Sequence, residues 1–168
     1  MIRDVVLLSL FPAAMAFAAA SDLLSMTISN RLSLFLAAGF FLAAALIGMP
    51  IVQVGWHVAA SMSVLAVAFG LFAAGWIGGG DAKFAAATAL WLGFSQLLEY
   101  FLFASLFGGV MTLLLLRARA WPLPGVFAGT RWIERLHAPD TGIPYGIALA
   151  AAGLMVYPHT VYMRALAG

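Results

Sequence analysis

Two aspartates in this sequence stand where charge is scarce, and together they could cut a peptide bond. Only 8% of the 168 residues are charged; Asp22 follows an apolar N-terminal stretch, and Asp81 lies within GWIGGGDAKF at residues 75–84. Two carboxylates that meet can share one proton, because like charges about 3 Å apart cannot both ionise. One then acts as general base on a water molecule and the other as general acid on a carbonyl group. This is the chemistry of an aspartic protease, and it needs no metal, thiol or serine.

The glycine triplet at 78–80 predicts how the second carboxylate is presented. Glycine lets a chain turn and lets backbones approach closely, so an unwound triplet would hold Asp81 toward a cleft. A purely structural alternative stays open. Asp81 would then be the N-cap of a helix that begins at Ala82, and Asp22 would end the first helix by hydrogen bonding at the membrane interface.

Composition determines the class of protein that must position these residues. The chain is 65% hydrophobic, and several apolar runs approach the roughly 20 residues that span a bilayer. We therefore expect an all-α integral membrane protein, a polytopic bundle of about six transmembrane helices formed by one domain over residues 1–168. Charged residues are too few to suggest a nucleic-acid partner. Cysteine is absent and the three histidines lack metal-ligand spacing, so no metal site is predicted.

The apolar runs and their breaks predict where the spans lie. The expected spans are roughly 5–21, 31–48, 54–75, 84–97, 99–116 and 143–164. Gly48-Met49-Pro50 is the break in the long uncharged run between Leu32 and Gly80. The fourth and fifth spans are alternatively one long tilted helix, which lowers the count to five. For the N-terminal run we favour a retained helix over a cleaved signal peptide.

The basic residues predict the orientation of these spans. One side of the predicted bundle carries Arg31, Lys83, Arg117, Arg119, Arg131 and Arg135, and the other carries Arg3 and Arg164. The positive-inside rule puts the first side in the cytoplasm. Asp22 ends the first span and Asp81 follows the third, so two crossings separate them. Both carboxylates are therefore expected on the cytoplasmic side.

The one sizeable polar connection runs from Arg117 to Asp140. Within it, residues 130–137 read TRWIERLH, which predicts a short interfacial helix capped by Thr130. Its apolar side chains would lie in the headgroup boundary. We expect this helix to anchor the connection at the membrane surface.

Beyond composition, the residues carry a resemblance to a known family. Gly78-Gly79-Gly80-Asp81 matches the GxGD signature of membrane-embedded aspartic proteases, and with Lys83 it resembles the GxGDxK form of type IV prepilin peptidases. Asp22 is followed six residues on by Ile28-Ser29-Asn30, similar to an Ile-Pro-Asn element in that family, with Ser29 in place of proline. Residues 143–148 read IPYGIA, similar to the Pro-Tyr-Gly element that opens the family's last helix. With the compact size, these features resemble the small prepilin peptidases of the tight-adherence (Flp) pilus systems.

The resemblance implies roles for particular residues. Asp22 and Asp81 would be the catalytic pair, without an assignment of which is base and which is acid. Gly78 and Gly80 would shape the approach to Asp81, and Lys83 would either tune the pair or extend to lipid headgroups. The other candidate supporting residues are Asn30, Pro144, Tyr145 and Gly146.

The resemblance also implies a substrate and partners. The substrate would be a prepilin with a short basic leader in the cytoplasm, cut just after a glycine, and the other partners would be the lipid bilayer and the pilus assembly machinery. The enzyme would lie in the bacterial inner membrane with its active site facing the cytoplasm. Larger relatives carry a cysteine-bearing insert and also N-methylate the new pilin terminus. This chain has no cysteine, so the resemblance implies cleavage without methylation and without any cofactor, S-adenosylmethionine included.

Other classes of function stay open on the same residues. A small proton-coupled transporter would use Asp22, Asp81 and Glu99 as a relay of ionisable groups within the membrane. A membrane scaffold would need neither aspartate. A GxGD protease with a different substrate is a third alternative.

Overall fold

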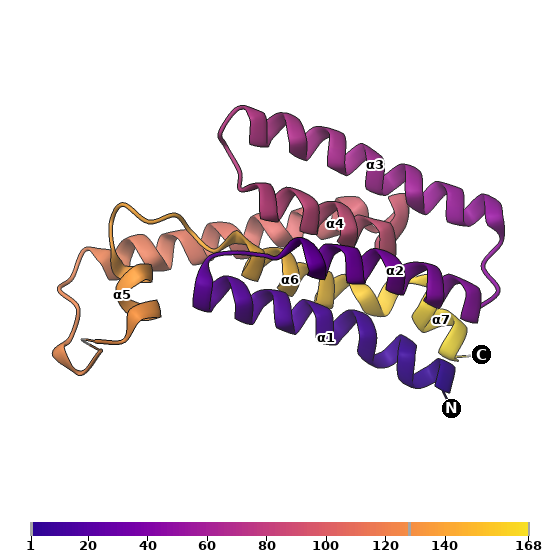
Figure 1. The fold of residues 1–168 in the computed structure, drawn as a ribbon, viewed down its shortest axis with the longest axis horizontal. Coiled ribbons are helices and arrows are strands. Elements are labelled where there is room, and N and C mark those ends of the chain that lie inside the picture. Colours follow the sequence, from indigo (N-terminus) through magenta and orange to yellow (C-terminus); the bar gives the residue numbers. More distant parts are fainter. Residues whose placement is uncertain (1, 128, 168) are drawn as a thin grey trace.

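The computed structural model of the chain describes residues 2–127 and 129–167, and in that part of the chain all regular structure is helical (Figure 1). The long helices run side by side along the long axis of the molecule. The elements are α1 (Ile2–Ser25), α2 (Asn30–Leu46), α3 (Ile51–Ala73), α4 (Gly79–Arg119), η1 (Gly125–Phe127), α5 (Arg131–His137), α6 (Tyr145–Val156), η2 (Tyr157–His159) and α7 (Val161–Ala167).

The first helix is longer than the apolar run alone predicts. α1 extends beyond Asp22 to Ser25 and ends where Met26 adopts a left-handed conformation, with a φ of 54°, a common way for a helix to end. The Met26 N–H donates to the Asp22 carbonyl oxygen at 2.7 Å. Asp22 therefore sits within the last turn of α1 rather than after its end.

Ser29 explains the start of the second helix. It precedes α2 with an extended backbone, and its hydroxyl oxygen accepts a hydrogen bond from the Leu32 N–H at 3.4 Å. This is the geometry of an N-cap. The serine that stands in place of proline thus caps the helix that follows it.

The long fourth helix turns back on itself at Gly93. That glycine has a φ of 65° and a ψ of 176°, a backbone conformation that is essentially restricted to glycine. Residues 79–92 and 94–119 consequently lie side by side, and Leu97 from the second half packs against Ala85, Ala86 and Ala89 from the first. We expected either one long helix or two helices that meet near residue 98; the break lies five residues earlier.

α3 is bound to the first half of α4 by two buried hydrogen bonds. His57 Nδ1 lies 2.8 Å from the Leu90 carbonyl oxygen, and the Ser61 hydroxyl donates to the Ala86 carbonyl oxygen at 2.8 Å. The alanines on this half of α4 let the two backbones approach closely, as small residues do between membrane helices.

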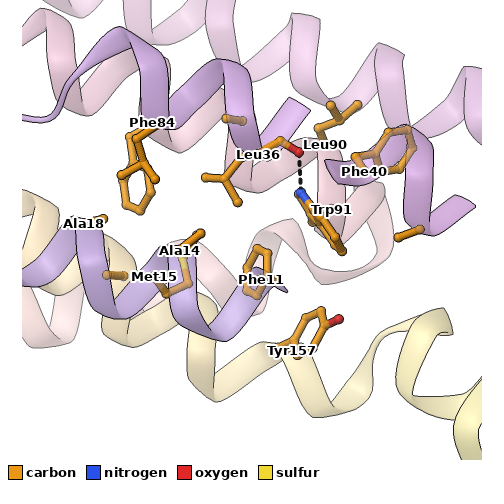
Figure 2. Packing of buried hydrophobic residues seen from close by; sticks show 14 of the residues in the cluster. Phe11, Ala14, Met15, Ala18, Leu36, Phe40, Phe84, Leu90, Trp91 and Tyr157 are labelled. Atoms are coloured by element: carbon orange, nitrogen blue, oxygen red, sulfur yellow. Dashed lines mark hydrogen bonds between the residues drawn. The ribbon is translucent and has the colours of Figure 1, made fainter. Parts of the chain in front are cut away.

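The core lies between α1, α2, the first half of α4 and the C-terminal segment (Figure 2). Trp91 is fully buried at its centre, and its indole N–H donates to the Leu36 carbonyl oxygen at 2.8 Å. Phe11 from α1 stacks on Tyr157 with ring centroids 4.5 Å apart, and the Tyr157 hydroxyl donates to the Leu7 carbonyl oxygen at 2.6 Å. These contacts fix α1 against the chain's C-terminal part.

Among the residues that the structure describes, three helices are long and apolar enough to cross a membrane: Arg3–Ser25 within α1, α3 and α4. α2 is apolar but shorter, and the predicted last span at 143–164 is divided into α6, η2 and α7. The count of six spans therefore stays a prediction. α5 forms where a short interfacial helix was expected, but the Thr130 side chain makes no capping hydrogen bond.

Candidate active site

Asp22 is presented from the last turn of α1 toward the beginning of α6. Its side chain is only 4% exposed, and the backbone N–H groups of Gly146 and Ile147 interact with its carboxylate. The other carboxylate oxygen, Oδ2, is buried and has no hydrogen-bond partner among the described residues. A buried oxygen left in this way costs about 1–3 kcal/mol. A hydrogen bond donated by a substrate or by a water molecule would remove that cost.

Asp81 lies in the first turn of α4. The N-cap is Gly78, with an extended backbone, and Gly79 and Gly80 are already helical. Both expectations for this segment were therefore wrong, because the glycine triplet is not unwound and Asp81 is not the N-cap. Instead the Gly78 N–H faces the Asp81 carboxylate, which is the return contact of a capping box.

Gly78 lets the Asp81 carboxylate lie close to the backbone. A Cβ atom at this position would lie 2.9 Å from Asp81 Oδ2, too close for the carboxylate to stay where it is. The capping contact holds one carboxylate oxygen against the backbone. This backbone contact therefore orients the Asp81 carboxylate.

Ile28 joins the surroundings of the two aspartates. A Cβ on Gly80, the residue before Asp81, would lie 3.3 Å from the Ile28 carbonyl oxygen, and a Cβ on Gly146 would lie 2.5 Å from Ile28 Cδ1. The end of α1 and the starts of α4 and α6 therefore converge on one residue of the α1–α2 connection. At this convergence Asp22 and Asp81 are near enough to interact electrostatically.

Lys83 reaches Asn30 rather than either aspartate. Its ammonium group donates to Asn30 Oδ1 at 2.9 Å, and both side chains are exposed. This bond ties the first turn of α2 to the second turn of α4. Lys83 and Asn30, both singled out from the sequence, therefore contact one another and not the two aspartates.

The Pro144-Tyr145-Gly146 element is brought to the same place. Pro144 precedes α6 and is buried, whereas Tyr145 is 46% exposed. The tyrosine ring covers Gly108 on α4, where a Cβ would lie 3.0 Å from Tyr145 Cε1, and its hydroxyl lies 3.3 Å from Thr112 Oγ1. The aromatic side chain therefore fixes the start of α6 against α4, next to the amides that face Asp22.

An apolar cavity of about 400 Å³ opens beside Asp81. Its walls come from α3, both halves of α4 and α6, and include Val67, Phe101 and Tyr145. Asp81 is the one charged residue among the described residues that line it. An apolar peptide segment of a few residues bound in this cavity would lie next to the Asp81 carboxylate.

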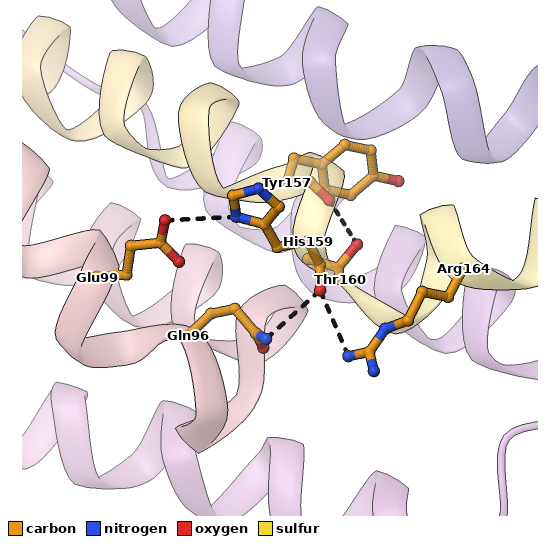
Figure 3. A network of polar contacts seen from close by, with 6 residues as sticks. All are labelled: Gln96, Glu99, Tyr157, His159, Thr160 and Arg164. Carbon is orange, nitrogen blue, oxygen red and sulfur yellow. Dashed lines mark hydrogen bonds and ion pairs between the residues drawn. The ribbon is translucent and has the colours of Figure 1, made fainter.

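Glu99 belongs to a network of polar contacts at the C-terminal segment (Figure 3). Its carboxylate pairs with His159 Nδ1 at 3.3 Å, and the His159 carbonyl oxygen accepts from Gln96 Nε2 at 3.5 Å and from Arg164 Nη2 at 3.4 Å. These side chains connect the second half of α4 to η2 and α7. Glu99 is also not among the residues that line the cavity beside Asp81.

Some residues that shape the site were not singled out from the sequence. Ile28 was read only as part of a motif, although it packs between two glycines of the site. Gly93, which brings Phe101 and Ala104 beside Asp81, is one of 17 glycines in the chain and has no neighbouring proline or charge to mark it. The left-handed conformation that distinguishes it is visible only in the fold.

Comparison with known proteins adds an independent finding to this geometry. Residues 9–113 match the sequence profile of the type IV leader peptidase family. That range covers more than half of the chain and contains both aspartates, Asn30 and Lys83. No curated protein and no solved structure matches the chain. The chain belongs to the type IV leader peptidase family.

Proposed function

We propose that this protein is an aspartic endopeptidase that removes the leader from Flp-type prepilins at the cytoplasmic face of the bacterial inner membrane, without N-methylation. Membership of the family indicates a peptidase and implies a prepilin substrate and a lipid bilayer around the enzyme. The aspartic mechanism, the Flp-type substrate and the absence of methylation are our own extensions of that assignment.

One observation carries the mechanism: Asp22 and Asp81 converge from different helices, and Asp81 lines an apolar cavity. Backbone N–H groups face both carboxylates, those of Gly146 and Ile147 toward Asp22 and that of Gly78 toward Asp81. The two carboxylates are near enough to interact electrostatically. In a dyad that shares one proton, the ionised carboxylate takes a proton from water while the water oxygen attacks the scissile carbonyl carbon. The protonated carboxyl group gives its proton to the carbonyl oxygen. Collapse of the tetrahedral intermediate then breaks the C–N bond. The leaving amine takes the proton that the first carboxylate received from water, and a hydroxyl group of the intermediate returns a proton to the second carboxylate.

The cavity supports a substrate with an apolar segment next to the scissile bond. Its lining is almost wholly hydrophobic apart from Asp81, Ser63 and Ser105, and the Ser63 hydroxyl already donates to the Ala59 carbonyl oxygen at 2.9 Å. An apolar segment gains free energy from such a lining at about 25 cal/mol per Å² of surface removed from water. The hydrophobic end of a prepilin would lie here, and its basic leader would extend past the aspartates into the cytoplasm.

The charges at the two ends of the bundle support the cytoplasmic placement of the site. The two termini lie together at one end, where Arg3 donates to the Ala165 carbonyl oxygen at 3.1 Å. α5 lies at the opposite end of the molecule (Figure 1). This second end carries the aspartates and most of the basic residues, as expected for a cytoplasmic face.

The position of Glu99 disfavours the transporter alternative. A relay would need ionisable groups in sequence across the membrane, but Glu99 pairs with His159 and is not among the described residues that line the cavity beside Asp81. We therefore expect Glu99 to contribute to packing of the C-terminal segment and not to the reaction.

The test is co-expression with an Flp-type prepilin in a host that lacks its own prepilin peptidase. Mass spectrometry of the product should show a pilin cut after the last leader glycine, with an unmethylated N-terminus. A prepilin with valine in place of that glycine serves as the matched control and should stay uncut. A methylated product would overturn the claim that cleavage occurs without methylation, and several Flp-type prepilins left uncut by abundant enzyme would overturn the proposed substrate.

A further inference from the structure

Arg119, the last residue of α4, is bound to a single stretch of the following connection. Its guanidinium group donates to the Leu136 carbonyl oxygen at 2.8 Å, the Thr141 carbonyl oxygen and hydroxyl at 3.1 Å each, and the Gly142 carbonyl oxygen at 3.0 Å. Four hydrogen bonds from three nitrogen atoms leave the bound stretch little freedom. A planar group with donors at fixed angles makes such a contact set, which a lysine cannot reproduce.

The bound stretch leads directly into the helix start that holds Asp22. Thr141 adds contacts within the connection, since its hydroxyl group lies 2.6 Å from the Arg135 carbonyl oxygen and 2.8 Å from the Ala138 carbonyl oxygen. Only the short segment Ile143-Pro144-Tyr145 separates Gly142 from Gly146, whose N–H interacts with the Asp22 carboxylate. The buried Pro144 restricts the backbone of that segment further.

The same connection also contacts the end of α1. Arg135 donates to the Leu24 carbonyl oxygen at 3.0 Å, two residues beyond Asp22. The connection that Arg119 holds therefore contacts α1, which carries Asp22, and leads into the start of α6, which lies against the Asp22 carboxylate. Arg117 lies two residues before Arg119 in the same helix. It is exposed, and its side chain makes no such contact among the described residues.

From this geometry we infer that Arg119 is a positioning residue for Asp22: it fixes the connection before α6 and thereby the start of α6, where the backbone at Gly146 lies against the Asp22 carboxylate. The inference rests on the proposed function for its catalytic consequence, but the anchoring itself is a property of the fold. Loss of the anchor should misplace the carboxylate and slow the chemical step, because small errors in the position of a catalytic group are costly to the rate.

The test compares Arg119→Gln, Arg119→Lys and the matched control Arg117→Gln in detergent-purified protein. Hydrogen exchange of peptides covering 143–149 should be at least about tenfold faster in Arg119→Gln than in wild type, because the start of α6 opens locally. With a prepilin substrate, kcat should fall by about 10- to 100-fold while KM changes less than about threefold. Arg119→Lys should be intermediate, and Arg117→Gln should match wild type within about twofold in both measurements.

These measurements separate a failure of the inference from a failure of the proposed function. Unchanged exchange in Arg119→Gln, an equal effect of Arg117→Gln, or a rise in KM with kcat unchanged would each overturn the positioning role. If wild type cuts no prepilin, the proposed function fails, and the exchange rates alone then decide whether Arg119 anchors the start of α6. Membrane abundance and unfolding temperature, measured for all variants, identify any that fail to fold.

Discussion

The absence of a side chain at Gly146 is what lets Asp22 lie where it does. A methyl group there would meet Asp22 Oδ2 at 2.7 Å and Ile28 Cδ1 at 2.5 Å. Contacts this short force one neighbour to move. Because Asp22 is buried, its carboxylate can move only by losing the two amides that face it.

We therefore predict that Gly146→Ala lowers the rate of prepilin cleavage by about 100-fold, the order expected when a catalytic group is misplaced. The assay is cleavage by membranes with matched amounts of enzyme. Gly70→Ala is the control, since a Cβ at Gly70 in α3 would meet nothing within 4 Å. Equal activity of the two variants would mean that the site tolerates a displaced Asp22.

At the residue scale, the sequence predicts which charged residues are candidates for the site but not which residues contact one another. The scarcity of carboxylates marks Asp22 and Asp81 as candidates, and the number of crossings predicts that they share one side. The Lys83 side chain contacts that of Asn30, and the Asp22 side chain lies against the backbone of Gly146. These contacts join residues 53 and more than 100 positions apart. Tertiary packing decides such pairs, and nothing in local spacing encodes them.

The hairpin formed by α4 depends on one backbone conformation. Gly93 combines a φ of 65° with close contact to His57, whose ring atoms would lie 3.0 Å from an added Cβ. His57 itself is fixed by its bond to the Leu90 carbonyl oxygen. The turn therefore has no room for a side chain and no freedom to adopt a different φ.

Gly93→Ala should destabilise the protein by about 1–3 kcal/mol, the range for a residue forced into such a conformation. We expect a lower unfolding temperature in detergent and reduced cleavage, because Phe101 and Ala104 form the cavity wall only when the hairpin closes. Gly109→Ala on the same helix is the control, with open space around its added methyl group. Identical unfolding temperatures for the two variants would contradict the account of the turn.

At the element scale, helices that begin beside a strong sequence signal were predicted well. α2 begins one residue before its predicted start, and α3 begins just after the predicted break at Pro50, three residues before its predicted start. The predicted boundaries fail where the signal is weak: α1 runs on past Asp22, and the α4 break falls at a glycine within an apolar run. Apolar residues favour helix on both sides of Gly93, so hydropathy alone does not locate the turn.

At the scale of the whole molecule, the distribution of basic residues predicts one orientation in the membrane. The α2–α3 connection and the two termini lie at the end opposite α5 (Figure 1). Because the chain contains no cysteine, single cysteines can report on each side. Pro139 is exposed in the connection before α6, and Ile51 is 81% exposed at the start of α3.

We predict that Ile51→Cys reacts with a membrane-impermeant maleimide in cells whose outer membrane alone has been opened. Pro139→Cys should react only after the inner membrane is also permeabilised, because the positive-inside rule puts that side in the cytoplasm. The cysteine-free wild type gives the background. The reverse pattern of labelling would place the aspartates on the outer side of the inner membrane. They could then not reach a prepilin leader that lies in the cytoplasm.

The central claim is that Asp22 and Asp81 act together as the catalytic pair. The most direct measurement is cleavage of one Flp-type prepilin by wild type, Asp22→Asn, Asp81→Asn and Glu99→Gln at matched membrane abundance. Asparagine keeps the shape of aspartate but neither takes nor gives the required proton, so each aspartate variant should lose at least about 100-fold in rate. Glu99→Gln should retain the activity of wild type. Full processing by either asparagine variant would contradict the two-aspartate mechanism.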